Sequence, residues 1–220
     1  LLMKLTVCCL VIAIILVSCK NERDPLDRIN RKIRGNSAGA FQRYLPQQYN
    51  DSDYYWQIVR EMRSTTKLPS IENGSKDFQI RIWEDVDRRR YHMLFLLMHD
   101  SSTWTTRGCV YKVKFLGEHR YALVGDLISL GDPKSGWNHF LNEIIDKGIM
   151  DLKDESDIPG YRDATDQSIV AVEIADKNYY RYYELPGAYD INASVKDAKA
   201  MVEILALIKK EFPQLQDTGE

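Results

Sequence analysis

Apolar residues alternate with polar ones along several stretches of the chain, and this period of two predicts half-exposed strands. The stretches with this pattern are residues 78–82, 109–115, 121–130, 168–174 and 179–185. Residues 91–98 (YHMLFLLM) are apolar at almost every position, which predicts a strand in the centre of the sheet. Gly117 separates two of the alternating stretches and indicates a tight hairpin turn between them.

Apolar residues spaced three and four apart predict helices elsewhere in the chain. The predicted helices are residues 38–44, 54–66, 133–147 and 195–212. Hairpin-length connections between the strands favour antiparallel pairing. Together these elements predict an α+β fold, with a mainly antiparallel sheet of about six strands and helices packed on one face.

The first nineteen residues follow a different pattern. Lys4 precedes an apolar run from Leu5 to Val17, which ends in the sequence Leu16-Val17-Ser18-Cys19. A charge, a short apolar core and small residues in this order are typical of a secretory signal. The 14 residues from Leu5 to Ser18 are fewer than the roughly 20 that a membrane-spanning helix needs.

The end of this leader resembles the lipobox of bacterial lipoproteins, in which an apolar residue and small residues precede a cysteine. In that family the cysteine is acylated and becomes the first residue of the mature protein. The resemblance implies a signal peptide of residues 1–18, a lipid on Cys19 that attaches the protein to a membrane, and a place in the cell envelope, on the outer membrane. An uncleaved anchor and a secretory signal without lipid remain as alternatives.

The polar residues 19–36 carry more basic than acidic side chains, and we interpret this segment as a lipidated tether. No linker-like stretch divides residues 37–213, which predicts a single α+β domain, followed by a tail of residues 214–220. Without residues 1–18 the chain has 29 basic and 32 acidic residues. A near-neutral chain offers no overall electrostatic basis for binding nucleic acid.

The predicted leader determines which cysteines would remain in the mature domain. Cys8 and Cys9 would leave with the signal peptide, and Cys19 would carry the lipid. Cys109 would then be the one thiol of the domain, which excludes an internal disulfide. Because Cys109 lies in an apolar, alternating stretch, we expect it to be buried in a strand.

Residues that could carry catalysis or hold a metal are scattered. The four histidines, His92, His99, His119 and His139, form no zinc-binding spacing, and the chain has no phosphate-binding glycine loop or dinucleotide fingerprint. We therefore expect no metal and no cofactor. An envelope hydrolase is the alternative function, and it would use His99 or His139 with acids such as Asp100 or Asp126.

Aromatic residues are the strongest functional signal. Trp104 lies in a loop rich in serine and threonine, and four tyrosines crowd one predicted strand: Tyr179, Tyr180, Tyr182 and Tyr183. Side chains on a strand alternate between its two faces, so we expect one pair of tyrosines to be exposed. Exposed aromatic rings bind sugars and protein partners. The sequence thus favours a lipid-anchored, non-enzymatic binding module for an envelope protein or glycan.

Overall fold

The structure, a computed structural model, describes residues 24–36, 41–45, 54–84, 92–117, 120–162 and 168–216. The leader, Cys19 and His119 lie outside these ranges, so the signal peptide and the lipid remain predictions. Among the described helices, none combines the length and the apolar character needed to cross a bilayer.

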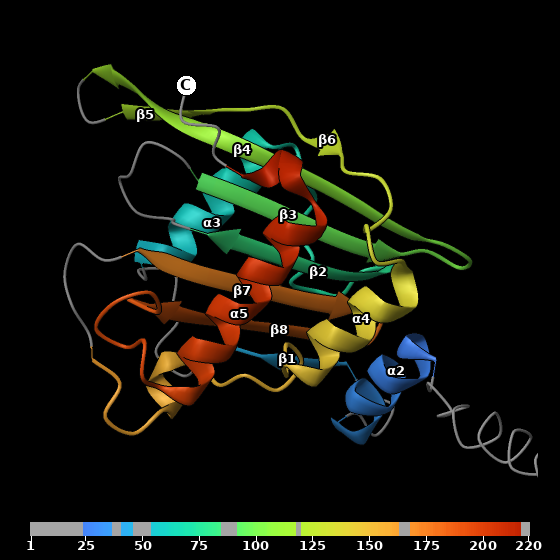
Figure 1. The fold of residues 1–220 in the computed structure, drawn as a ribbon. Coiled ribbons are helices and arrows are strands. Elements are labelled where there is room, and N and C mark those ends of the chain that lie inside the picture. The colour runs from blue at the N-terminus through green and yellow to red at the C-terminus, as the bar shows by residue number, and fades with distance from the viewer. Residues whose placement is uncertain are drawn as a thin grey trace, which may run out of the picture.

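One mixed sheet forms the centre of the domain (Figure 1). Its strands are β1 (Gln42–Tyr44), β2 (Phe78–Glu84), β3 (His92–His99), β4 (Trp104–Gly117), β5 (Arg120–Val124), β6 (Ile128–Ser129), β7 (Ile169–Asp176) and β8 (Tyr179–Pro186). Seven strands follow the order β1-β8-β7-β2-β3-β4-β5, and β6 pairs with β4. β1 runs parallel to β8, whereas the other pairings among the described strands are antiparallel. The α+β class is confirmed, but the sheet is mixed and has more strands than predicted.

Helices cover both faces of this sheet. They are α2 (Pro25–Asn36), α3 (Tyr54–Thr65), α4 (Trp137–Asp146) and α5 (Lys196–Glu211), with 3-10 turns η1 (Glu155–Asp157) and η2 (Pro213–Leu215). Helices α4 and α5 cross one face, and α3 lies behind the other (Figure 1). The prediction that helices pack on one face is therefore wrong.

The two covered faces produce two apolar cores, because neighbouring side chains on a strand point in opposite directions. On the α5 face, Ile80, Phe95 and Val172 belong to a large cluster that includes residues of α4 and α5. On the α3 face, Trp83 and Leu94 belong to a smaller cluster with Val59 and Met62 of α3. Cys109 belongs to this second core and is buried as predicted.

Helix α2 replaces most of the predicted tether. Ile29 and Ile33, one turn apart, are buried in the α5-face core. Arg28 donates hydrogen bonds to Asp146 (2.5 Å) and Asn142 (2.7 Å) on α4, and Lys32 forms an ion pair with Asp151. The boundary between tether and domain thus lies before residue 25. The sequence concealed it because the two buried isoleucines are surrounded by charged residues.

Two strand predictions also need correction. Residues 42–44, placed in a helix by the sequence pattern, form β1, because pairing with β8 overrides the weak local preference. The predicted strand of residues 121–130 is divided into β5 and β6. A Cβ atom at Gly125 would lie 2.6 Å from Cys109 Sγ, so the backbone passes too close to β4 for any other residue.

Candidate functional site

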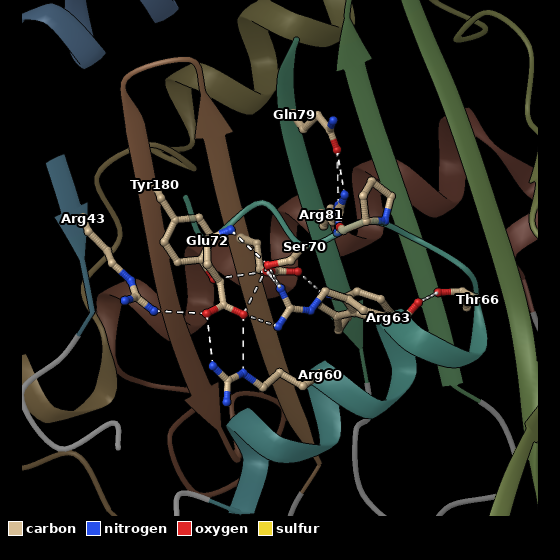
Figure 2. Close-up of polar contacts among 12 residues, drawn as sticks. Arg43, Arg60, Arg63, Thr66, Ser70, Glu72, Gln79, Arg81 and Tyr180 are labelled. Atoms are coloured by element: carbon tan, nitrogen blue, oxygen red, sulfur yellow. Dashed lines mark hydrogen bonds and ion pairs between the residues drawn. The ribbon is translucent and has the colours of Figure 1, made fainter. Parts of the chain in front are cut away.

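An arginine cluster lies between α3 and the sheet (Figure 2). We define it by four arginines and two glutamates: Arg43, Arg60, Arg63, Arg81, Glu72 and Glu173. The contributing elements are β1, α3, the turn before β2, β2 itself and β7. Segments far apart in the sequence therefore meet here.

Glu72 forms the outer part of the cluster, where three guanidinium groups converge on one carboxylate (Figure 2). Its nearest partners are Nη2 of Arg63 at 2.6 Å, Nη2 of Arg43 at 3.1 Å and Nη2 of Arg60 at 3.2 Å. Burial raises the pKa of Glu72, but the hydrogen bonds and positive charges of Arg60 and Arg63 prevail and hold this pKa below its ordinary value. Glu72 is thus held in its charged form.

Glu173 forms the inner part of the cluster and has no exposed surface. Its carboxylate accepts hydrogen bonds from Nη1 of Arg63 (3.3 Å), the indole N–H of Trp83 (3.1 Å) and the hydroxyl of Tyr180 (3.1 Å). A buried carboxylate needs such donors, because leaving water removes its hydration. Arg63 therefore joins the inner and outer carboxylates.

Arg81 is the most deeply buried of the four arginines. Its guanidinium donates to Oε1 of Gln79 (3.0 Å) and to the backbone carbonyl of Pro69 (2.9 Å). Burial lowers the pKa of Arg81, which the charge of Glu173 partly offsets. The inner cluster thus contains two buried arginines near a single buried carboxylate.

The cluster reaches the surface through Arg43 and Arg60, whose side chains are 41% and 39% exposed. A guanidinium presents five N–H donors and can hold a carboxylate or phosphate through two parallel hydrogen bonds. The rim of the cluster is therefore suited to binding an anionic group.

One exposed aromatic side chain, Phe41, lies beside this rim. It is 42% exposed and approaches Gly74 in the turn that carries Glu72. Tyr44, which is 43% exposed, points to the opposite face of the sheet, where its ring lies 5.6 Å from that of Tyr179. The rim thus combines positive charge with apolar surface.

The aromatic residues singled out from the sequence have other roles. All four tyrosines of β8 are buried, which corrects the prediction of an exposed pair: Tyr179, Tyr180, Tyr182 and Tyr183. Helices cover both faces of β8, and β1 covers its edge, so neither set of side chains reaches solvent. Trp104 is half-buried and packs against His99, Phe78 and Trp137.

The hydrolase candidates are not assembled into a site. Asp100 accepts hydrogen bonds from Ser102 and Thr103 in its own turn, which lower its pKa. His139 lies exposed on α4, where its Nε2 is 3.7 Å from Oε1 of Glu143, beyond hydrogen-bond distance.

The remaining candidates, His99 and Asp126, also lie outside any acid–base pair that the structure records. The His99 ring packs against Trp104 with 4.6 Å between ring centroids, and Asp126 is exposed in the connection after β5. Within the described ranges, no three metal-binding side chains are grouped so as to hold an ion.

Sequence reasoning missed every member of the arginine cluster. The available signal was a charged residue inside an apolar strand: Glu173 in IVAVEIAD and Arg81 in FQIRIWE. Such a residue needs a partner of opposite charge from another element. Comparison of the chain with known protein families, curated proteins and solved structures finds no match.

Proposed function

We propose that this chain is a lipid-anchored protein of the cell envelope, and that its domain binds a protein partner that carries carboxylate groups. The leader from Met3 to Cys19 supports the location. The single observation that supports binding is the pair of partly exposed guanidinium groups, Arg43 and Arg60, that lie side by side on Glu72 at the rim of the arginine cluster.

A protein partner fits the composition of this rim. Arginine is enriched among the residues that contribute most to protein–protein affinity. Arg43, Tyr44 and Phe41 belong to or adjoin β1, which within the described residues pairs with β8 alone. An edge strand of this kind offers backbone groups to an extended segment of a partner. Carboxylates on that segment would complement the two arginines.

Binding is tested by affinity capture from envelope extract with residues 20–220 as the bait, followed by affinity measurement with the isolated partner. We expect Arg43→Gln and Arg60→Gln each to weaken binding about tenfold or more, since each removes a charged hydrogen-bond donor. Lys199→Gln, an exposed change on α5, is the matched control and should bind as the unmodified bait does.

Two outcomes would contradict the proposed binding. A partner held as tightly by both arginine variants would contradict the assignment of the binding surface. A captured ligand that resists protease but is destroyed by glycosidase would show a glycan partner and contradict the choice of a protein.

The anchor is tested separately in cells. Cys19→Ala should release the protein from the membrane fraction or leave its leader uncleaved, because the lipid acceptor is gone. Cys8→Ala alters a cysteine of the leader that we do not expect to be acylated, and it should leave membrane association unchanged. If the leader of the Cys19→Ala protein were cleaved as before and the protein stayed in the membrane fraction, the lipoprotein proposal would be contradicted.

A further inference from the structure

We infer that α2 is the membrane-facing element of the domain, and that its outer surface lies against the phosphate groups of the bilayer. This inference rests on the lipid at Cys19 proposed above. It goes beyond anchoring, because it specifies which side of the domain faces the membrane.

The first step concerns the number of residues between Cys19 and the start of the domain. Since α2 begins at Pro25 and is packed on the body, only residues 20–24 separate Cys19 from the fold. Fully extended, this segment spans at most about 20 Å. A tether of residues 19–36 would have reached about 60 Å and allowed any orientation.

The second step compares this reach with the size of the domain. A domain of about 190 residues has a radius of gyration of about 16 Å and a diameter of about 40 Å. If α2 lay on the side away from the membrane, Pro25 would be farther from the bilayer than the free chain can extend. The start of α2 must therefore lie in the half of the domain nearest the membrane.

The third step is the helical arrangement of α2. Ile29 and Ile33 face the core, whereas Arg31 and Arg34 are exposed and lie on the opposite side of the helix. Asp27 is exposed on the same outer stripe, one turn before Arg31. The two basic residues with salt-bridge partners on the body, Arg28 and Lys32, occupy the flank between these sides.

The outer stripe is suited to a phospholipid surface. Arg31 and Arg34 offer charged donors that match phosphate oxygens, and basic residues close to an anionic leaflet are attracted to it. The partners of Arg28 and Lys32, Asp146 and Asp151, are acids whose charges these pairs offset. The lipid brings α2 to the bilayer, and the arginines hold its outer surface there.

The test uses the lipid-modified protein, purified from membranes and placed in phosphatidylcholine vesicles with one fifth phosphatidylglycerol and an acceptor dye on the headgroups. A donor dye is attached at Gly35→Cys on α2 or at Lys210→Cys on α5, in a Cys109→Ala background. A side chain at Gly35 meets no atom within 4 Å. The C-terminal end of α5 lies over β3 and β4, away from α2 (Figure 1).

We expect at least twofold more efficient energy transfer from position 35 than from position 210. Inserting fifteen glycine and serine residues between Lys20 and Asn21, which leaves the hydrogen bonds of Asp24 to the start of α2 in place, should reduce this difference. The double variant Arg31→Glu/Arg34→Glu should reduce transfer from position 35, whereas Lys196→Glu/Lys199→Glu on α5 should not. Equal transfer from both positions with the native connection, or greater transfer from position 210, would overturn the inference.

The outcomes separate this inference from the proposal on which it rests. A protein that carries no lipid and does not float with vesicles refutes the anchor. A lipid-modified protein that floats but gives equal transfer refutes the orientation alone.

Discussion

Glu173 receives its hydrogen bonds from three different elements of the fold. It has no exposed surface, and the donors are Arg63 of α3, Trp83 of β2 and Tyr180 of β8. Such a carboxylate is stable only while its charged partner remains, because neither group keeps its hydration. Removal of one charge should therefore cost more than removal of an exposed ion pair.

The variant Glu173→Gln tests this dependence. It leaves Arg81 buried without the neighbouring negative charge and leaves Arg63 with Glu72 alone of its two carboxylate partners, and we expect the free energy of unfolding to fall by about 3–5 kcal/mol. Urea unfolding followed by tryptophan fluorescence measures the change. Glu203→Gln, which removes an exposed partner of Lys147, is the control and should leave the unfolding midpoint nearly unchanged. A similar midpoint for both variants would show that Glu173 has no special role.

Glu72 predicts how stability depends on pH. Its pKa in the folded protein is below the ordinary value of 4.5, so its charged form stabilises the fold at pH values above 4.5. This contribution is lost as the pH falls below 4.5 and through the folded-state pKa. The stability difference between the unmodified protein and Glu72→Gln should therefore be present at pH 7 and shrink toward pH 3. Urea unfolding at several pH values gives this difference, and a constant difference would contradict the assignment.

At the scale of elements, the connection between β5 and β6 depends on Gly125. An added Cβ would lie 2.6 Å from Cys109 Sγ, 2.7 Å from Tyr111 Cβ and 2.9 Å from the carbonyl oxygen of Val110. We expect Gly125→Ala to destabilise the domain by about 1–3 kcal/mol through overpacking. Gly35→Ala in α2 is the matched glycine change, and with open space around it we expect about 0.4–1 kcal/mol of stabilisation. Thermal unfolding of both variants measures these changes. A higher unfolding temperature for Gly125→Ala than for Gly35→Ala would contradict the prediction.

Helix α2 makes the second prediction at this scale. Since Ile29 is 1% exposed, Ile29→Ala should lower the free energy of unfolding of residues 20–220 by about 2–5 kcal/mol. Arg34→Ala on the exposed side should have little effect. Equal effects of the two changes in urea unfolding would restore the interpretation of residues 25–36 as a tether.

The sequence predicted those elements whose pattern is local. The β7–β8 hairpin, the β4–β5 hairpin and the helices now labelled α4 and α5 all form, although α4 begins at Trp137 rather than Pro133. The parts it missed depend on contacts between distant segments. β1 is a strand because β8 lies beside it, and the tyrosines of β8 are buried because α3 covers a second face. The arginine cluster could not be predicted as a unit, because its six residues come from five separate segments.

At the scale of the whole molecule, the pairing of β2 with β7 joins the two parts of the sheet. In this pairing Gln79 lies opposite Ala175 and Glu84 opposite Val170. A fragment of residues 24–162 would lack β7, β8 and α5, leaving one edge of β2 unpaired and the α5-face core uncovered. We expect this fragment to show no cooperative urea transition, whereas residues 24–216 should unfold in one step. A cooperative transition of the fragment would show that residues 24–162 form an independent unit.

The order of strands also decides when the molecule can fold. Among the described strands, β1 pairs only with β8, and β2, which pairs with β3 on one side, finds its second partner in β7, near the end of the chain. Pairing between such distant segments is slow, because a long loop must close before any contact forms. β1 and one edge of β2 therefore stay unpaired until the last third of the chain has emerged. For a protein exported through the leader proposed here, that delay would help the polypeptide to pass unfolded through a secretion channel. The sheet would then be completed in the compartment on the other side of the membrane.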